Sequence, residues 1–133
     1  MRIHMISGRV IGIDFKLHGR NYSCISTYLP HCGYSQEEID ETYNQLRCLV
    51  SKAYRSNKRV IICGDFNTQS NVGNRGIALD QFVLEFRLCA TNASDADANV
   101  NWTFESSMGV RRRLNFALAS KLLLLVCRAQ SII

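Results

Sequence analysis

The sequence lacks the long apolar stretches that would attach it to a membrane. The run LLLLV at 122–126 is far too short to cross a bilayer. The opening MRIHMISGRV has no continuous apolar region of the kind found in signal peptides. We therefore expect a protein without a membrane partner, in which residues 122–126 contribute to a core.

Cysteine pairs of the Cys-x-x-Cys kind are also absent, which argues against the common zinc and redox motifs. The chain nevertheless has 6 cysteines, at Cys24, Cys32, Cys48, Cys63, Cys89 and Cys127. Several fall inside segments that the sequence predicts to be buried. We interpret them as reduced thiols, which are typical of an intracellular protein of the nucleus or cytoplasm. A nucleophile made from the adjacent His31 and Cys32 is not expected, because chain neighbours rarely face each other productively.

Acidic residues are fewer than basic ones. The chain has 11 Asp and Glu against 16 Lys and Arg, a net charge of +5 and a pI near 9.0. This excess favours an anionic partner, since basic side chains that approach phosphates release counterions. With 47% hydrophobic residues, the 133-residue chain has enough apolar material for one globular domain. We place that domain at residues 1–120, followed by a divergent tail at 121–133.

The first part of the chain predicts a β-hairpin followed by a long helix. Residues 9–17, RVIGIDFKL, alternate as in a half-buried strand, and YSCISTYL at 22–29 is the returning strand. Pro30, the only proline, ends it. Ser35 followed by Glu38 forms a capping box, and apolar residues then recur at helical spacing to about residue 56. A crossover helix between strands indicates an α/β fold.

The stretch RVIICGDFN, residues 59–67, organises the rest of the chain. Its four apolar residues from Val60 to Cys63 predict a strand buried on both faces. Gly64 is expected to let the backbone turn, so that Asp65 and Asn67 stand just beyond the strand's carboxyl end. A carboxylate and an amide fixed there suggest phosphate-ester chemistry. The alternative is that both residues are ordinary turn formers.

The second half of the sequence predicts one more helix and two more strands. After a polar loop at 68–76, the segment IALDQFVLEF at 77–86 has helical periodicity. Asp-rich residues in the loop 91–101 imitate a calcium-binding loop, but the required glycine and glutamate are missing, so we assign no metal there. The segments 102–104 and 113–119 are expected to be strands joined by a turn around Gly109.

Several motifs, taken in order, resemble one family. They are YLPH at 28–31, the long helix, VIICGDFN at 60–67, WTF at 102–104 and RRRLNFAL at 111–118. Together they resemble the endonuclease/exonuclease/phosphatase superfamily. Within it, their amino-acid sequence is most similar to the endonucleases of non-LTR retroelements. The resemblance implies an α/β fold of the DNase I-like kind, in which two β-sheets pack with helices outside. For this chain we expect a fragment of that sandwich.

The resemblance also implies roles for three residues at strand ends. Asp65 matches the aspartate that orients or deprotonates the attacking water, and Asn67 matches the asparagine that binds the scissile phosphate. Tyr28 matches a tyrosine that contacts the phosphate. The roles of Asp65 and Asn67 fit the chemistry, because an anionic diester repels hydroxide and its hydrolysis needs a positioned base and hydrogen-bond donors. His31 is interpreted as an exposed loop histidine.

Further contacts to the substrate are expected from the segment after residue 101. Trp102 is assigned to the core or to the wall of the substrate groove. Arg111, Arg112 and Arg113 could bind nucleic-acid phosphates or could form a solvated turn, and the sequence leaves both readings open.

Two essential parts of the family's site have no counterpart in the sequence. The metal-holding glutamate near the start of the domain is missing, and so is the late histidine. Asn115 replaces the aspartate that supports that histidine, and an amide carries no charge to stabilise an imidazolium. The other glutamates, Glu37, Glu38, Glu85 and Glu105, do not have the family's placement. Mg²⁺ is thus implied by the resemblance, but we assign no metal ligand in this chain.

These observations lead to one leading function and two alternatives. The leading interpretation is a metal-dependent phosphodiesterase domain of the endonuclease type acting on DNA, incomplete and weakly active or inactive, as in a truncated or decayed element. The first alternative is a module that binds nucleic acid or protein without catalysis. The second is a phosphatase acting on phosphoinositides or nucleotides. The similarity of the motifs to retroelement endonucleases argues against this second alternative.

Overall fold

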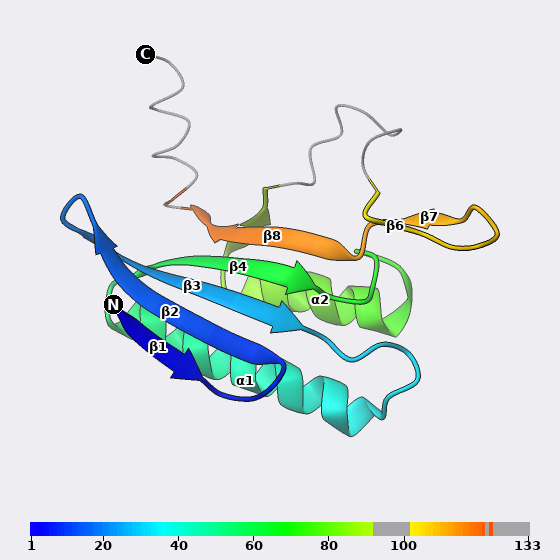
Figure 1. Cartoon of the computed structure of the whole chain (residues 1–133), viewed down its shortest axis with the longest axis horizontal. Coiled ribbons are helices and arrows are strands. Elements are labelled where there is room, and N and C mark those ends of the chain that lie inside the picture. Colours follow the sequence, from blue (N-terminus) through cyan, green and yellow to red (C-terminus); the bar gives the residue numbers. More distant parts are fainter. Residues whose placement is uncertain (92–101, 122, 124–133) are drawn as a thin grey trace, which may run out of the picture.

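The computed structural model describes residues 1–91, 102–121 and 123, and it shows a mixed α/β fold (Figure 1). The strands are β1 (Arg2–Met5), β2 (Val10–Leu17), β3 (Arg20–Tyr28), β4 (Arg59–Asp65), β5 (Leu88–Ala90), β6 (Phe104–Glu105), β7 (Arg111–Arg112) and β8 (Asn115–Ser120), and the helices are α1 (Gln36–Arg55) and α2 (Gly73–Glu85). One sheet has six strands in the order β1-β2-β3-β4-β8-β5, and β6 and β7 pair separately. Both helices cover the same face of the large sheet (Figure 1). The predicted α/β class is confirmed.

The hairpin of β2 and β3 forms as the sequence predicts, with a tighter turn. Leu17 pairs directly with Arg20, so only His18 and Gly19 form the connection. Both have positive φ, 48° and 75°, which a two-residue hairpin turn of this kind requires. The sequence analysis overlooked β1, which pairs antiparallel with β2 at the edge of the sheet. This strand has only four residues, which is too few for a reliable periodic signal.

Helix α1 confirms the expected capping box. The Glu38 N–H donates to Ser35 Oγ at 3.3 Å, and the Ser35 N–H donates to Glu38 Oε2 at 3.2 Å. The helix then carries the chain from β3 to β4, which lie parallel to each other. Such a crossover places the carboxyl ends of β3 and β4 at the same edge of the sheet.

Replacing Ser35 by alanine removes the side-chain half of this cap. We expect the free energy of unfolding to fall by about 1 kcal/mol, because one N–H of the first turn loses its partner. Urea unfolding followed by circular dichroism measures the change. Ser56→Ala, at the other end of α1, makes the same chemical change where the cap bonds come from the backbone alone. An equal loss in both variants would contradict the role of the cap.

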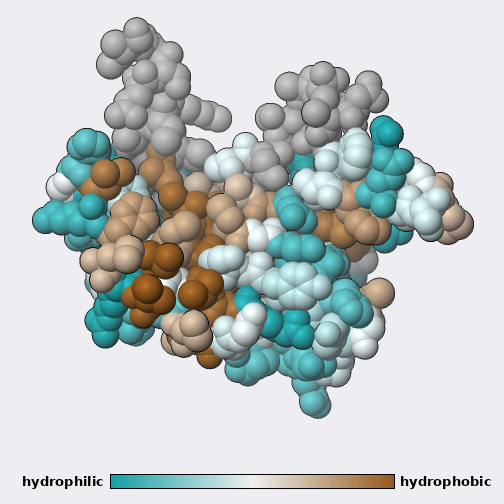
Figure 2. Space-filling view, in the orientation of Figure 1, coloured by the Kyte–Doolittle hydropathy of each residue, from teal (hydrophilic) through white to brown (hydrophobic). Residues whose placement is uncertain are grey.

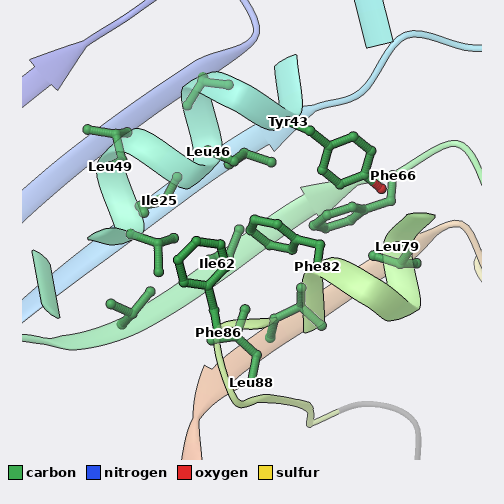
Figure 3. Packing of buried hydrophobic residues seen from close by; sticks show 14 of the residues in the cluster. Ile25, Tyr43, Leu46, Leu49, Ile62, Phe66, Leu79, Phe82, Phe86 and Leu88 are labelled. Atoms are coloured by element: carbon green, nitrogen blue, oxygen red, sulfur yellow. The ribbon is translucent and has the colours of Figure 1, made fainter. Parts of the chain in front are cut away.

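One continuous core fills the space between the sheet and the helices. Leu46 and Val50 of α1 and Phe82 of α2 are fully buried against Ile25 and Ile62 of the sheet (Figure 3). The aromatic rings of this core contact one another, with the centroids of Phe82 and Phe86 5.2 Å apart and those of Phe82 and Tyr43 5.6 Å apart. Burial raises the pKa of the Tyr43 hydroxyl. The apolar face predicted for 77–86 therefore packs as expected, although α2 begins earlier, at Gly73.

Strand β4 differs from its prediction in two respects. Val60 and Ile62 are buried under the helices, whereas Cys63 on the other face is exposed, so the expected burial on both faces is wrong. Gly64 does not make a turn but continues the strand. A Cβ atom at this position would lie 1.9 Å from the carbonyl oxygen of Thr27 in β3, so glycine is needed for the close approach of two backbones.

The face of the sheet opposite the helices carries many apolar side chains. Paired residues of neighbouring strands point to the same side, and the apolar ones on this side include Ile3, Met5, Ile11, Ile13, Phe15, Leu17, Tyr22, Cys24, Ile61, Cys63 and Ala117. Figure 2 shows hydrophobic side chains gathered over the part of the sheet where β1, β2 and β3 lie. We call this side the open face. It explains why β4 is buried on one side only.

The segments after residue 101 pair differently from the prediction. WTF and RLNFALA were expected to form two strands around Gly109, but Phe104–Glu105 instead pairs with Arg111–Arg112. The turn at Gly109 is present, with φ of 77°. Asn115–Ser120 joins the large sheet between β4 and β5. The three-residue strand β5 directly follows α2 and was also overlooked.

A charged cluster lies under α1, far from the carboxyl end of β4. Asp14 Oδ2 accepts a hydrogen bond from Lys58 Nζ at 2.6 Å and lies 2.6 Å from His4 Nε2. Burial of Asp14 raises its pKa, but the bonds from Lys58, His4 and Ser23 lower it more, to about 2. The cluster joins β1, β2 and the start of β4.

Three expectations can be compared only in part with the structure. The five described cysteines, Cys24, Cys32, Cys48, Cys63 and Cys89, are free. No helix in the described ranges is both long and apolar enough to span a membrane. The imitation of a calcium loop at 92–101, and all but Leu123 of the run 122–126, lie outside the described residues.

Candidate functional site

Three polar side chains meet at one edge of the large sheet. Tyr28 ends β3, Asp65 ends β4 and Asn115 begins β8, and the strand register places Tyr28 and Asn115 on either side of Asp65. Directly paired residues point to the same face of a sheet, so all three belong to the open face. Tyr28 is 46% exposed. The structure thus brings together residues that are far apart in the sequence.

The loop after β4 is fixed by a buried phenylalanine between two polar residues. Phe66 is fully buried, and its N–H donates to the Leu114 carbonyl at 2.8 Å. Its ring meets that of Phe116 edge to face, with centroids 5.9 Å apart. Because Phe66 points into the core, Asp65 and Asn67 are held at the rim of the sheet.

Asp65 and Asn67 are also bonded to the surrounding backbone. Asp65 Oδ1 accepts from the Asn67 N–H at 2.8 Å, and Asn67 Nδ2 donates to the Leu29 carbonyl at 2.6 Å. Asn67 has a φ of 48°, in the left-handed region that asparagine tolerates better than most residues. Both residues therefore have the geometry of turn formers, as the alternative interpretation expects. Their side chains are positioned before any ligand binds.

Aromatic and basic side chains surround Tyr28. The guanidinium carbon of Arg9 lies 5.8 Å from the ring centroid of Tyr28 and 4.6 Å from that of Tyr34. This places a positive charge beside the tyrosine that ends β3. His31 lies in the next loop, where its ring contacts Tyr34 and its Nδ1 accepts from the Gly33 N–H at 3.0 Å. The sequence analysis did not identify Arg9.

Asn115 stands directly opposite Asp65, and its backbone is bonded to the residue that precedes β6. The N–H groups of Leu114 and Asn115 both donate to Thr103 Oγ1, at 2.9 and 3.0 Å. All histidines of the chain lie elsewhere: His4 contacts Asp14, His18 forms the hairpin turn and His31 contacts Tyr34. The amide of Asn115 therefore has no imidazolium to support among the contacts of the described residues.

The three consecutive arginines have three different surroundings. Arg111 Nε lies 3.3 Å from Glu105 Oε2, and its guanidinium carbon lies 4.8 Å from the ring centroid of Trp102. Arg112 faces a hollow that Asn67 also lines. Arg113 lines another hollow, near Phe116. Trp102 itself is 36% exposed and lies against Arg111, so it is not part of the core, and its place in the wall of a substrate groove stays a prediction.

The described residues do not provide the ligands of a magnesium site. Hard cations such as Mg²⁺ require oxygen ligands, above all carboxylates. The carboxylate at this edge is that of Asp65. Within residues 1–91, 102–121 and 123, no group of three His, Cys, Asp or Glu side chains lies close enough together to hold a metal. Glu38, Glu85 and Glu105 are engaged with Ser35, Arg47 and Arg111. The residues present do not fit the metal that the resemblance implies, and we derive no step through it.

One basic residue near the site was missed because it falls in a stretch that looked like a loop. Arg75 belongs to the first turn of α2, and its Nη2 donates to the Pro30 carbonyl. It therefore links α2 to the loop after β3. The polar sequence TQSNVGNRG predicted a loop over 68–76, and only the helical conformation from Gly73 turns Arg75 towards the site.

Solved structures with a similar fold include an endonuclease domain and an endonuclease/exonuclease/phosphatase family protein. The endonuclease domain of TRAS1, a telomere-specific non-LTR retrotransposon, is similar with a TM-score of 0.63 and 18% identity over 87% of this chain and 52% of that one. An endonuclease/exonuclease/phosphatase family protein from Leptotrichia buccalis is similar with a TM-score of 0.57 and 22% identity over 84% of this chain and 41% of that one. The resemblance inferred from the motifs is thus confirmed at the level of the fold.

The likeness is partial in length. The chain spans about half of the first structure and about two fifths of the second. Neither a family model nor a curated protein matches the sequence. The described residues therefore form a fragment of a DNase I-like fold, with one large sheet, a small second sheet and the helices on one face.

Proposed function

We propose that the edge of the sheet at Asp65 binds a phosphodiester of nucleic acid, and that this chain hydrolyses it weakly or not at all. The observation that carries the proposal is the convergence of Tyr28, Asp65 and Asn115 on three neighbouring strands, with Asn67 fixed beside them. DNA is the expected partner, because one of the similar structures is a retrotransposon endonuclease domain and the chain has a net charge of +5.

Binding is supported by the donors and charges around this edge. Asn67 has a second amide N–H besides the one it gives to Leu29, and the Tyr28 hydroxyl is exposed. Arg9 adds positive charge beside Tyr28. Asn67 can donate to a phosphate oxygen without first rearranging, because its bond to the Leu29 carbonyl already holds the side chain in place.

Weak hydrolysis follows from the chemistry of the same groups. Asp65 could accept a proton from an attacking water, since carboxylates commonly act as general bases. Protonation of the leaving group needs an acid, and Asn115 is an amide where a carboxylate would orient one. Among the described residues Asp65 is the carboxylate at this edge, so charge that develops on the phosphate would be stabilised by the hydrogen bonds and by the positive charge of Arg9.

Plasmid nicking tests the proposal directly. We expect the purified chain in Mg²⁺ to relax supercoiled DNA no faster than buffer, or slowly and in a manner that Asp65→Ala abolishes. Glu37→Ala, which removes the same charge from the exposed first turn of α1, is the matched control. Fast nicking that depends on Mg²⁺ and is lost in Asp65→Ala would contradict weak hydrolysis and support the complete enzyme.

A binding experiment separates the remaining readings. We expect affinity for a DNA duplex in EDTA that falls with salt and survives Asp65→Ala, because neutralisation of phosphates needs no catalytic carboxylate. Absence of any DNA binding at low salt would contradict the proposal and leave protein partners as the candidates.

A further inference from the structure

A pocket with two arginines lies next to Asn67. It has a volume of about 340 Å³ and is lined by Asn67, Thr68, Gln69, Val72, Gly73, Asn74, Arg75, Arg112 and Leu114. We call it the arginine pocket. None of these lining residues is acidic. A second hollow, of about 560 Å³ beside the start of α1, is lined by Arg9 but also by Glu37, Glu38 and Glu41, so its lining suits an anion less well.

Arg75 provides a fixed positive charge in the wall of the arginine pocket. Its Nη2 is bonded to the Pro30 carbonyl, and its Nε and Nη1 are buried without a hydrogen-bond partner in the described part of the chain. No carboxylate in the described ranges forms an ion pair with it. A guanidinium that is partly removed from water and not neutralised raises the local potential for an anion.

Arg112 provides a second positive charge in the lining of the pocket. Unlike Arg111 and Arg113, it is not engaged elsewhere in the described part of the chain. Arg111 is occupied by Glu105 and Trp102. Arg113 points to a separate hollow lined by Gln69, Ser70, Ala90 and Phe116. Arg112 is exposed and makes no ion pair within residues 1–91, 102–121 and 123. Its side chain is therefore free to bind a ligand in the pocket.

The amino end of α2 lines the same pocket as these two arginines. Val72 is the N-cap residue and makes no side-chain cap, and the first turn contains no acidic residue. The helix has 13 residues, and its first residues Gly73 and Asn74 line the pocket. Uncapped N–H groups and the helix dipole favour an anion at this point. Two cationic side chains and one helix end thus converge on the same space.

We propose that the arginine pocket binds a phosphate of the same nucleic-acid strand, next to the phosphate held at Asp65 and Asn67. This inference rests on the proposed function. Asn67 is shared, since it stands at the rim of the sheet and also lines the pocket. A strand that crosses the edge would place consecutive phosphates first at Asn67 and then between Arg75 and Arg112.

Comparison of Arg112→Ala with Arg111→Ala tests the assignment. Both variants remove one positive charge from the same two-residue strand, so a non-specific loss of charge affects them equally. We expect Arg112→Ala to weaken binding of a labelled DNA duplex about tenfold in EDTA and to reduce the slope of log affinity against log salt by about 1. Arg111→Ala should change the affinity less than threefold, because Glu105 already neutralises that charge. Arg112→Lys should recover part of the affinity.

The outcomes separate this inference from the proposed function. If wild-type chain binds DNA and the two alanine variants weaken it equally, the pocket assignment is overturned while the proposed function stands. If wild-type chain does not bind DNA at low salt, both fail. Inorganic phosphate provides a further arm: an Arg112-dependent thermal shift in phosphate, with DNA affinity unchanged in Arg112→Ala, would show a site for the free anion and overturn the nucleic-acid assignment. Unchanged thermal unfolding of Arg112→Ala in plain buffer confirms that the variant folds.

Discussion

Replacing Gly64 by alanine is expected to prevent the chain from folding or to lower its free energy of unfolding by at least about 3 kcal/mol. The added Cβ would lie 1.9 Å from the Thr27 carbonyl oxygen and 2.8 Å from its carbonyl carbon. Both are backbone atoms of β3, so no side-chain rotation can relieve the overlap. β3 and β4 would have to separate at the point where they carry Tyr28 and Asp65.

Urea unfolding of Gly64→Ala measures this loss, and Gly8→Ala is the matched control. A Cβ at Gly8 meets no atom within 4 Å, and this residue does not have positive φ. Gly8→Ala is therefore expected to be neutral or slightly stabilising, since alanine reduces the entropy of the unfolded chain. A Gly64→Ala variant as stable as Gly8→Ala would show that the two strands are not as close as the structure places them.

Loss of the Asp14 charge is expected to produce the largest pH effect on stability. The pKa of Asp14 is lowered from its ordinary value of 3.8 to about 2 in the folded chain. This difference corresponds to about 2 kcal/mol of stability, because each unit of pKa is worth about 1.4 kcal/mol. A lowered pKa favours folding while the carboxylate is ionised. The contribution is therefore complete above about pH 4 and is lost as the pH falls through 2.

Asp14→Asn tests this assignment. We expect it to lower the free energy of unfolding at pH 7 by about 2 kcal/mol. Lys58 and His4 would then face a neutral amide instead of the Asp14 carboxylate, whose side chain is only 12% exposed. The difference from wild type should shrink as the pH falls towards 2. Asp40→Asn, on the exposed surface beside Gln36, is the control and should change little at any pH. A constant difference between Asp14→Asn and wild type from pH 7 to pH 2 would contradict the charge as the cause.

The elements that the sequence predicts well are those whose signals are local. Ser35 and Glu38 determine the start of α1 within four residues of chain, and the helical spacing that follows determines its buried face. The hairpin of β2 and β3 is equally local. The edge position of Asp65 and Asn67 also follows from short-range evidence, since a buried strand ends directly before them.

The features that escape the sequence depend on contacts with distant segments. Nothing in Val60–Cys63 shows that only one face of the sheet is covered, because the cover comes from α1 and α2. The requirement for Gly64 comes from Thr27, which is 37 residues away in the numbering of the chain. Residues 111–113 are all arginine, so the sequence does not distinguish them. Their different partners depend on how the small sheet is placed beside β8. Arg75 was missed for the same reason, since its neighbour Pro30 belongs to another element.

The bonds of Asp65 and Asn67 have a consequence for how this gene can change over time. Asn67 joins β4 to the end of β3 through the Leu29 carbonyl, and Asp65 holds the Asn67 N–H, so both residues are needed to shape the loop even when no substrate is turned over. A copy that has lost hydrolysis would still be selected to keep them as long as it must fold. Persistence of the letters GDFN in a descendant therefore records that its scaffold was maintained, and activity has to be judged from the residues that surround it.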